Sequence, residues 1–227
     1  MAIAAQTLRE QVASACRILA VEGYADLTLG HVSARHGDGT VVIKRKGIAL
    51  GEVEPEDVVD VDGEGVDLHL ETVLHTAVYA AWPDVGAVVH GHPPYATALA
   101  ATDAELELLT HDAVLFADGL ARFDDPALIV EDGQGAAVAA ALGTHRAVLL
   151  SNHGVLVVGK DIGWMVLAAV TLERAARLQA IAGTLGTLRP ISQRLAAELQ
   201  PVKYQDRFVS EYWEAWLRRL PPAAGES

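Results

Sequence analysis

Cysteine, aromatic residues and basic residues are all scarce in this 227-residue sequence. The single cysteine, Cys16, excludes an intrachain disulfide and is typical of a protein from the reducing cytoplasm. Asp and Glu total 30 against 17 Lys and Arg, which gives a formal net charge of −13. Nucleic acids and anionic membrane surfaces both select basic proteins. We therefore predict a protein that acts on small molecules, with no nucleic-acid or membrane partner.

Long hydrophobic runs are also missing. No apolar stretch approaches the ~18 residues that a membrane-spanning helix needs. Arg9 and Glu10 interrupt the N-terminal pattern where a signal peptide would be apolar. Hydrophobic residues nevertheless make up 51% of the chain, which is enough for a substantial core. We expect one cytoplasmic domain over residues 1–227, with a helical C-terminal tail at about 190–220.

The apolar pattern alternates between the two-residue period of strands and the longer period of helices. Strands are expected at residues 30–34, 40–44, 58–61, 85–90, 128–130, 147–150 and 155–158. Helices are expected at residues 6–22, 71–81, 94–101, 135–142 and 161–182, with two more after Pro190 and Pro201. Turns at residues 37–39 and 62–65 are interpreted as hairpin connections. Hairpins and crossover helices together predict a layered α/β fold with a mixed sheet.

The run AVVHGHP contains the most informative pair of side chains, His90 and His92. Side chains two apart on a strand share a face, so both imidazoles are expected to point the same way. Two adjacent neutral imidazoles bind a first-row transition metal well. Pro93 ends the strand and places the pair at an element end, where functional sites commonly lie. By itself the His-Gly-His motif is weak evidence for a metal site. The alternative is that both histidines have a purely structural role.

Two further residues complete a candidate metal site. His153 follows the second buried strand in the same way that His92 follows the first. Three imidazoles from strand ends, with one coordination position left for substrate, describe a catalytic metal site. Glu71 stands before a helix and offers a carboxylate, which acts either on a proton or as a helix-start charge that complements the dipole.

Ordered motifs along residues 8–178 resemble the class II aldolase and adducin family. They are GHVSAR at 30–35, the loop at Gly47, Glu71 before His75, PDVGAVVHGH at 83–92 and NHG at 152–154. The resemblance implies a three-layer αβα fold around a mixed, mostly antiparallel sheet, and a homotetramer with active sites between subunits. It also implies a divalent metal held by His90, His92 and His153, with Glu71 as a further ligand or as acid and base. Zinc suits three imidazoles, while manganese, cobalt and iron accept the same ligands.

The anion pocket departs from the sugar-phosphate aldolases of this family. Their glycine loop reads Thr-Pro-Thr-Gly, whereas this chain has Lys-Arg-Lys-Gly at 44–47. Those enzymes place an asparagine at the position of His31 and two serines at the positions of His69 and Leu70. Leu70 donates no hydrogen bond, so the usual phosphate cradle is expected to be absent.

The basic loop instead predicts a clamp for substrate carboxylates, with an Arg fork well matched to such a group. A solvated edge strand is the alternative for these cations. The substrate contacts expected from the sequence are His31, Ser33, Lys44, Lys46 and Gly47.

A carboxylate-bearing, unphosphorylated substrate favours decarboxylation by a metal-dependent lyase. Some members of the family decarboxylate dihydroxyaromatic acids such as a dihydroxyphthalate, and the basic glycine loop resembles theirs more than that of a sugar-phosphate aldolase, so this resemblance implies a substrate of that kind. Glu71 would handle a proton, with a pKa raised by burial against the opposing effect of the metal. His111 lies in the region where the aldolases of this family bring a tyrosine from a neighbouring subunit, so the resemblance makes it a candidate acid; a helix-start histidine at a subunit boundary is the alternative. The C-terminal residues resemble the tail that closes over an adjacent site in the family, and Tyr204 is the expected contact from it. The alternatives are aldol cleavage of a sugar phosphate or hydroxyacid, and a non-catalytic, adducin-like module.

Overall fold

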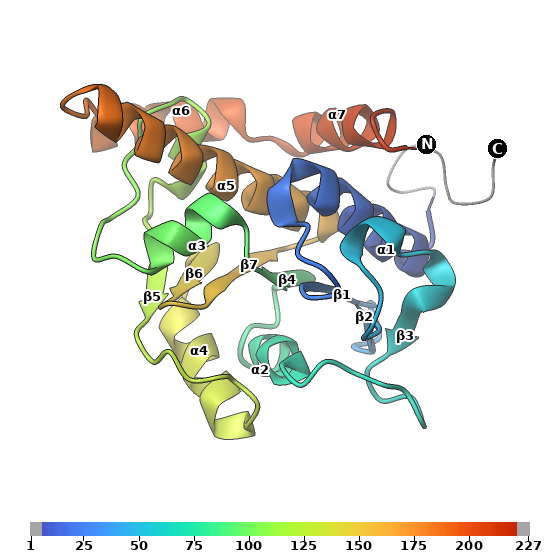
Figure 1. The fold of residues 1–227 in the computed structure, drawn as a ribbon. Helices are drawn as coiled ribbons and strands as arrows, with labels where there is room; N and C mark the ends of the chain where they lie inside the picture. The colour runs from blue at the N-terminus through green and yellow to red at the C-terminus, as the bar shows by residue number, and fades with distance from the viewer. Residues whose placement is uncertain (1–5, 222–227) are drawn as a thin grey trace.

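The computed structural model describes residues 6–221 and has a seven-stranded sheet between two layers of helices (Figure 1). The strands are β1 (His31–Arg35), β2 (Val41–Lys44), β3 (Val58–Asp60), β4 (Ala87–Gly91), β5 (Ala121–Phe123), β6 (Ala147–Leu150) and β7 (Gly154–Gly159). They are ordered β3-β2-β1-β4-β7-β6-β5. Every neighbouring pair is antiparallel except β5 and β6, which confirms the predicted mixed, mostly antiparallel sheet.

Helices cover both faces of this sheet, as the αβα architecture requires (Figure 1). One face carries α2 (Thr72–Ala81) and α4 (Asp132–Leu142), whose apolar side chains pack on β4, β6 and β7. The opposite face carries α1 (Leu8–Leu19), α3 (Pro94–Ala100) and α5 (Ile162–Leu185), and α7 (Asp206–Leu217) packs on α5 and α1. Further along the chain α6 (Gln193–Lys203) packs against the short helix Ala113–Phe116. Single helical turns lie at Ala20–Tyr24, Leu50–Glu52 and Pro55–Asp57.

Strand alternation places polar residues under α2. Val88 of β4 packs with Leu74 of α2, and His90 lies two residues further on the same face. The antiparallel register pairs His31 with His90 and Ser33 with Val88, so the β1 residues share that face. A mixed apolar and polar layer therefore lies between the sheet and α2, and its polar end contains the candidate site.

Two sequence-based expectations between residues 60 and 130 were wrong. Residues 128–130 form no strand, since Leu128 and Val130 are exposed and only Ile129 packs into the core. The edge strand is instead β5, a three-residue segment with a central arginine that lacks the apolar run by which strands are recognised. The turn at 62–65 is no hairpin connection, because β3 leads into a loop and then α2.

The C-terminal helices lie within the expected helical region. The helices expected after Pro190 and Pro201 are α6 and α7, although Pro201 itself lies inside α6, which ends two residues later at Lys203. A proline there removes one backbone hydrogen bond near the helix end, where the cost is smallest. Among residues 6–221, no helix combines the length and the apolar composition needed to cross a bilayer.

Candidate active site

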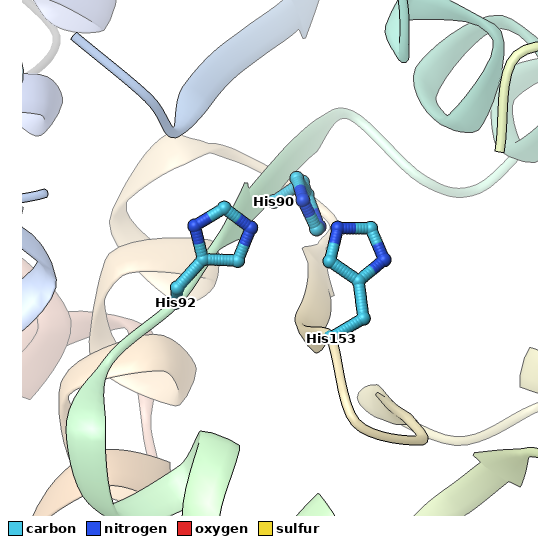
Figure 2. Close-up of side chains that lie close together, drawn as sticks. All are labelled: His90, His92 and His153. Carbon is cyan, nitrogen blue, oxygen red and sulfur yellow. The ribbon is translucent and has the colours of Figure 1, made fainter. Parts of the chain in front are cut away.

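Three imidazoles from separate stretches of the chain meet at one place (Figure 2). His90 belongs to β4, His92 lies just beyond the end of that strand, and His153 lies in the turn between β6 and β7. One ring nitrogen from each residue lies within 4.8 Å of the others. The structure thus brings together the three residues expected from the sequence to hold a metal.

Close packing at Gly154 permits this convergence. A Cβ atom at position 154 would lie 2.6 Å from the carbonyl oxygen of Gly91 and 2.7 Å from Cδ2 of His92. Any larger residue would therefore push β7 away from His92. A glycine directly after His153 lets the turn and the end of β4 approach each other.

Hydrogen bonds fix the tautomers of two of these rings. Nδ1 of His90 lies 3.1 Å from the carbonyl oxygen of Val155, and Nδ1 of His92 lies 2.9 Å from Oδ2 of Asp26. Both oxygens accept, so each Nδ1 carries the hydrogen and each Nε2 has a free lone pair. Among the described residues, neither buried Nε2 atom has a hydrogen-bond partner. Buried atoms of this kind are normally satisfied, and a divalent metal fits the pair.

Glu71 joins the same group. It occupies the N-cap position of α2, yet its side chain caps no backbone N–H. Its Oε2 atom lies 3.5 Å from Nε2 of His90 and its Oε1 atom lies 3.4 Å from Nε2 of His153. Burial raises the pKa of Glu71, but His153 and His90 together lower it by more, and the net pKa is below the usual value. This direction is opposite to the raised pKa expected from the sequence.

A cavity of about 320 Å³ opens beside this cluster. It is bordered by both polar and apolar residues: Thr28, Leu29, Gly30, His31, Lys46, Gly47, His69, Leu70, Glu71, His90, His92 and Leu128. Of the expected substrate contacts, His31, Lys46 and Gly47 are therefore at the cavity.

The other two expected contacts are not. Lys44 is fully buried, and its amine donates to the carbonyl oxygen of Thr28 at 3.1 Å and lies 3.3 Å from Nε2 of His69. Burial lowers the pKa of this amine. Ser33 is also fully buried, and its hydroxyl contacts His75 at 2.6 Å. Both lie behind residues that border the cavity.

The basic loop is only partly a clamp. Arg45 does not reach the cavity; it pairs with Asp57 at 2.9 Å on the outer side of the strand. Lys46 does reach it and is half exposed, 3.6 Å from Asp67. The predicted Arg fork is therefore wrong, because alternation along the strand turns that side chain outward.

His111 and Tyr204 lie apart from the histidines of the same chain. The hydroxyl of Tyr204 donates to the carbonyl oxygen of Asp112 at 2.6 Å, and His111 is exposed beside it. Tyr204 borders a separate cavity of about 250 Å³ that shares no residue with the histidine cavity. Their expected role at a neighbouring subunit's site stays a prediction.

Three residues near the site were missed by sequence reasoning. Asp26 lies in a loop after α1 and has no recognisable spacing from His92. His75 is four residues after Glu71 on α2, a helical spacing that signals a shared face. Tyr79 follows His75 by another four residues and contacts Ser33 at 2.8 Å. The four-residue spacing of Glu71, His75 and Tyr79 therefore predicts from the sequence that the three side chains share one face of the helix.

Comparison with known proteins agrees with the fold. The profile described as Class II Aldolase and Adducin N-terminal domain matches residues 10–180. The chain belongs to the class II aldolase and adducin family.

Its relatives differ in reaction. A 3,4-dihydroxyphthalate decarboxylase from Arthrobacter keyseri is 30% identical over 211 residues, covering 84% of this chain and 85% of that protein. An L-fuculose phosphate aldolase from Methanococcus maripaludis is 31% identical over 176 residues, covering 75% of this chain and 94% of that protein. The solved L-fuculose 1-phosphate aldolase from Glaciozyma antarctica has a TM-score of 0.81 at 25% identity, covering 94% and 88% of the two chains. Family membership therefore supports a lyase and leaves the reaction open.

Proposed function

We propose that this protein is a metal-dependent lyase that decarboxylates a dihydroxyaromatic carboxylate. The observation that carries the proposal is the lining of the cavity beside the histidines. Leu29, Leu70 and Leu128 border it, and Leu70 is 69% exposed. Apolar walls suit the faces of an aromatic ring and offer nothing to a phosphate. The relative named 3,4-dihydroxyphthalate decarboxylase supports the same choice.

His90, His92 and His153 would hold the divalent metal, with zinc preferred and manganese, cobalt or iron as alternatives. When bound, such an ion withdraws electrons from substrate oxygens and thereby stabilises negative charge as a bond to carbon breaks. Glu71, at 3.5 Å or less from two of the rings, is positioned to hold or move a proton.

The remaining residues orient the substrate. Lys46 supplies a positive charge at the cavity rim for a carboxylate. His31 supplies a ring nitrogen deeper in the cavity. The positive φ of Gly47, 85°, gives the loop its turn, and a Cβ atom there would contact nothing within 4 Å. This loop therefore has room for an anionic group beside its backbone.

A neighbouring subunit is proposed to complete the site in a homotetramer. Tyr204 and His111 lie on the same side of the chain, next to Asp112, and share one surface region. They would contact the substrate together from the adjacent subunit, with His111 as the acid that protonates the product carbon. We place the protein in the cytoplasm.

Aldol cleavage is the second candidate, favoured by the identity to the Methanococcus aldolase. The two reactions give different products. Each metal-loaded form would be incubated with dihydroxyaromatic acids, with hydroxyacids and with sugar phosphates, and released carbon dioxide and aldehyde would be measured. Carbon dioxide without aldehyde supports the proposal, and aldehyde from a phosphorylated sugar would replace it. Metal content tests the adducin-like alternative, since a scaffold would bind less than one ion per chain even after reloading.

A further inference from the structure

A chain of buried hydrogen bonds runs from the cavity to the interior of the α2 layer. Nδ1 of His31 lies 2.6 Å from Nε2 of His75, and Nδ1 of His75 lies 2.6 Å from Oγ of Ser33. The same Oγ lies 2.8 Å from the hydroxyl of Tyr79. All four side chains are at most 6% exposed. Only His31 borders the cavity, so the other three act on the cavity through it.

The distances alone allow the hydrogen bonds along this chain to be donated in either of two directions. In one, Tyr79 donates to Ser33, Ser33 donates to His75, and His75 donates to His31. In the other, every donor and acceptor is exchanged. The histidines are neutral in both cases, because burial, followed by the neighbouring histidines, lowers the pKa of His31 well below its usual value and that of His75 to about 3.

The buried end of the chain distinguishes the two directions. Among the residues the structure describes, the Tyr79 hydroxyl contacts Ser33 Oγ and the backbone of Val88. The Val88 contact lowers the pKa of Tyr79, as a donating N–H does, so Ser33 Oγ is the acceptor available for the Tyr79 hydrogen. If Ser33 donated to Tyr79, the Tyr79 hydrogen would be buried without an acceptor. An unsatisfied buried donor is strongly disfavoured. The hydrogen of Ser33 is also buried, and among the described residues His75 Nδ1 is the remaining partner for that hydroxyl, so Ser33 donates to His75. The chain therefore runs from Tyr79 towards His31.

This direction determines which nitrogen of His31 carries the hydrogen. Nδ1 of His31 accepts from His75, so a neutral ring must carry its hydrogen on Nε2. We propose that Tyr79, Ser33 and His75 are positioning residues that hold His31 as an Nε2–H donor to an anionic oxygen of the substrate. The substrate part of this inference rests on the proposed function, whereas the tautomer does not.

The same tautomer gives His31 a different role from that of the metal-binding histidines. One nitrogen of His31 lies within 4.8 Å of a nitrogen of His90 and an oxygen of Glu71, a second grouping with metal-ligating side chains. A protonated Nε2 has no lone pair for a metal. His90 and His92 have the opposite arrangement, because both donate through Nδ1. His90 and His92 thus offer nitrogen lone pairs to a cation, whereas His31 offers a hydrogen bond to an anion.

Neutron diffraction from crystals of the perdeuterated protein, as purified, tests the tautomer directly. We expect deuterium on Nε2 of His31 and none on Nδ1. Deuterium on Nδ1 of His31 in the unmodified chain would overturn the inference, whatever the behaviour of any variant.

Two substitutions of similar size at position 75 provide a matched pair. In His75→Gln the amide nitrogen can still donate to His31 while its oxygen accepts from Ser33, so the tautomer of His31 should be unchanged. In His75→Glu both carboxylate oxygens accept, so His31 should carry its deuterium on Nδ1. The same position of deuterium in both variants would contradict the role of the chain.

Binding of 3,4-dihydroxybenzoate to the metal-loaded forms, measured by calorimetry, tests the role in recognition. We expect His75→Gln to keep the Kd within about threefold and His75→Glu to weaken it about tenfold or more, the size of one lost hydrogen bond. Equal affinities would remove His31 from substrate binding. The result of the product assay is independent of the tautomer. A protein that releases no carbon dioxide but carries hydrogen on Nε2 of His31 would contradict the proposed reaction and leave the inferred tautomer standing.

Discussion

Asp26 accepts a hydrogen bond from Nδ1 of His92 at 2.9 Å, which turns the free Nε2 lone pair of that ring towards His90 and His153. A carboxylate behind a metal-binding imidazole fixes its tautomer and raises its basicity. The loop after α1 therefore supports a site built mainly from β4 and the turn before β7.

Replacement of Asp26 by alanine should weaken metal binding. Loss of such a supporting carboxylate costs about 10- to 100-fold in affinity. Zinc affinity would be measured by competition with a chromophoric chelator. Asp38→Ala is a matched control, because Asp38 bonds only to Thr40 in an exposed turn. Equal affinity in Asp26→Ala and the unmodified chain would show that Asp26 does not support metal binding through His92.

Gly154→Ala should disturb the same site from the other side. The added methyl would lie 2.7 Å from Cδ2 of His92 and 2.6 Å from a backbone oxygen, so β7 or the ring must shift. We expect a loss of about 1–3 kcal/mol in the free energy of unfolding from overpacking. Zinc affinity should fall at least tenfold with it.

Gly133→Ala is the control for this change. Gly133 lies in α4, where an added Cβ atom would meet nothing within 4 Å, and alanine favours the helix by about 0.5–1 kcal/mol. Denaturant unfolding and zinc titration of both variants check the pair. A Gly154→Ala protein with unchanged affinity would mean that the close approach at this turn does not hold His92.

These contacts show where sequence reasoning succeeds and where it ends. His90 and His92 could be paired from the sequence because the two-residue period of a strand is local. The contact between Asp26 and His92 joins residues 66 apart, and no local pattern encodes it. Likewise the direction of the chain from Tyr79 to His31 depends on the register of β1 against β4 and on α2 lying over both.

The same contrast between local patterns and contacts of distant residues applies to the prediction of the fold. The strand β7 and the capped helix α5 are marked by long apolar stretches of sequence, and their positions agree with the prediction to within a few residues. The edge strand β5 has three residues and is defined by pairing with β6 alone. Such a short strand has no sequence pattern of its own, so it cannot be recognised from the spacing of apolar residues. The apolar run at residues 128–130 fits a strand pattern better, which explains why the strand was expected there.

Lys46→Ala should raise the KM for an anionic substrate with little change in kcat. Lys46 borders the cavity, and loss of an exposed charge contact costs about 1 kcal/mol, or roughly fivefold. Arg45→Ala removes the same charge one residue away, where the side chain pairs with Asp57 outside the cavity. Steady-state kinetics should therefore separate the two variants. Equal increases in KM would point to the overall charge of the loop rather than to a contact.

Stability should fall in acid because of His75. Burial, with smaller contributions from His90 and His69, lowers its pKa from 6.5 to about 3 in the folded protein, so the unfolded chain takes up the proton first. The stabilising effect of neutral His75 is complete above pH 6.5 and is lost as pH falls from 6.5 towards 3. At 1.36 kcal/mol per unit, about 3 kcal/mol is lost at pH 4.5.

Urea unfolding of the metal-free protein at pH 7 and pH 4.5 measures this loss. His75→Gln has no proton to take up at position 75, so its free energy of unfolding should fall by about 3 kcal/mol less over the same range. Parallel losses in the two proteins would show that His75 is accessible to protons in the folded state.

Mixed oligomers test whether the active site is shared between subunits. His90→Ala should abolish metal binding, and Tyr204→Phe should slow turnover by removing the hydroxyl that the tail contributes. If each site combines the histidines of one subunit with Tyr204 of the next, some sites in a mixed oligomer have neither substitution. Activity should then reappear when the two variants are unfolded together and refolded, although each alone stays low. A mixture no more active than the average of the separately refolded variants would show that Tyr204 and His90 do not complete one site from different subunits.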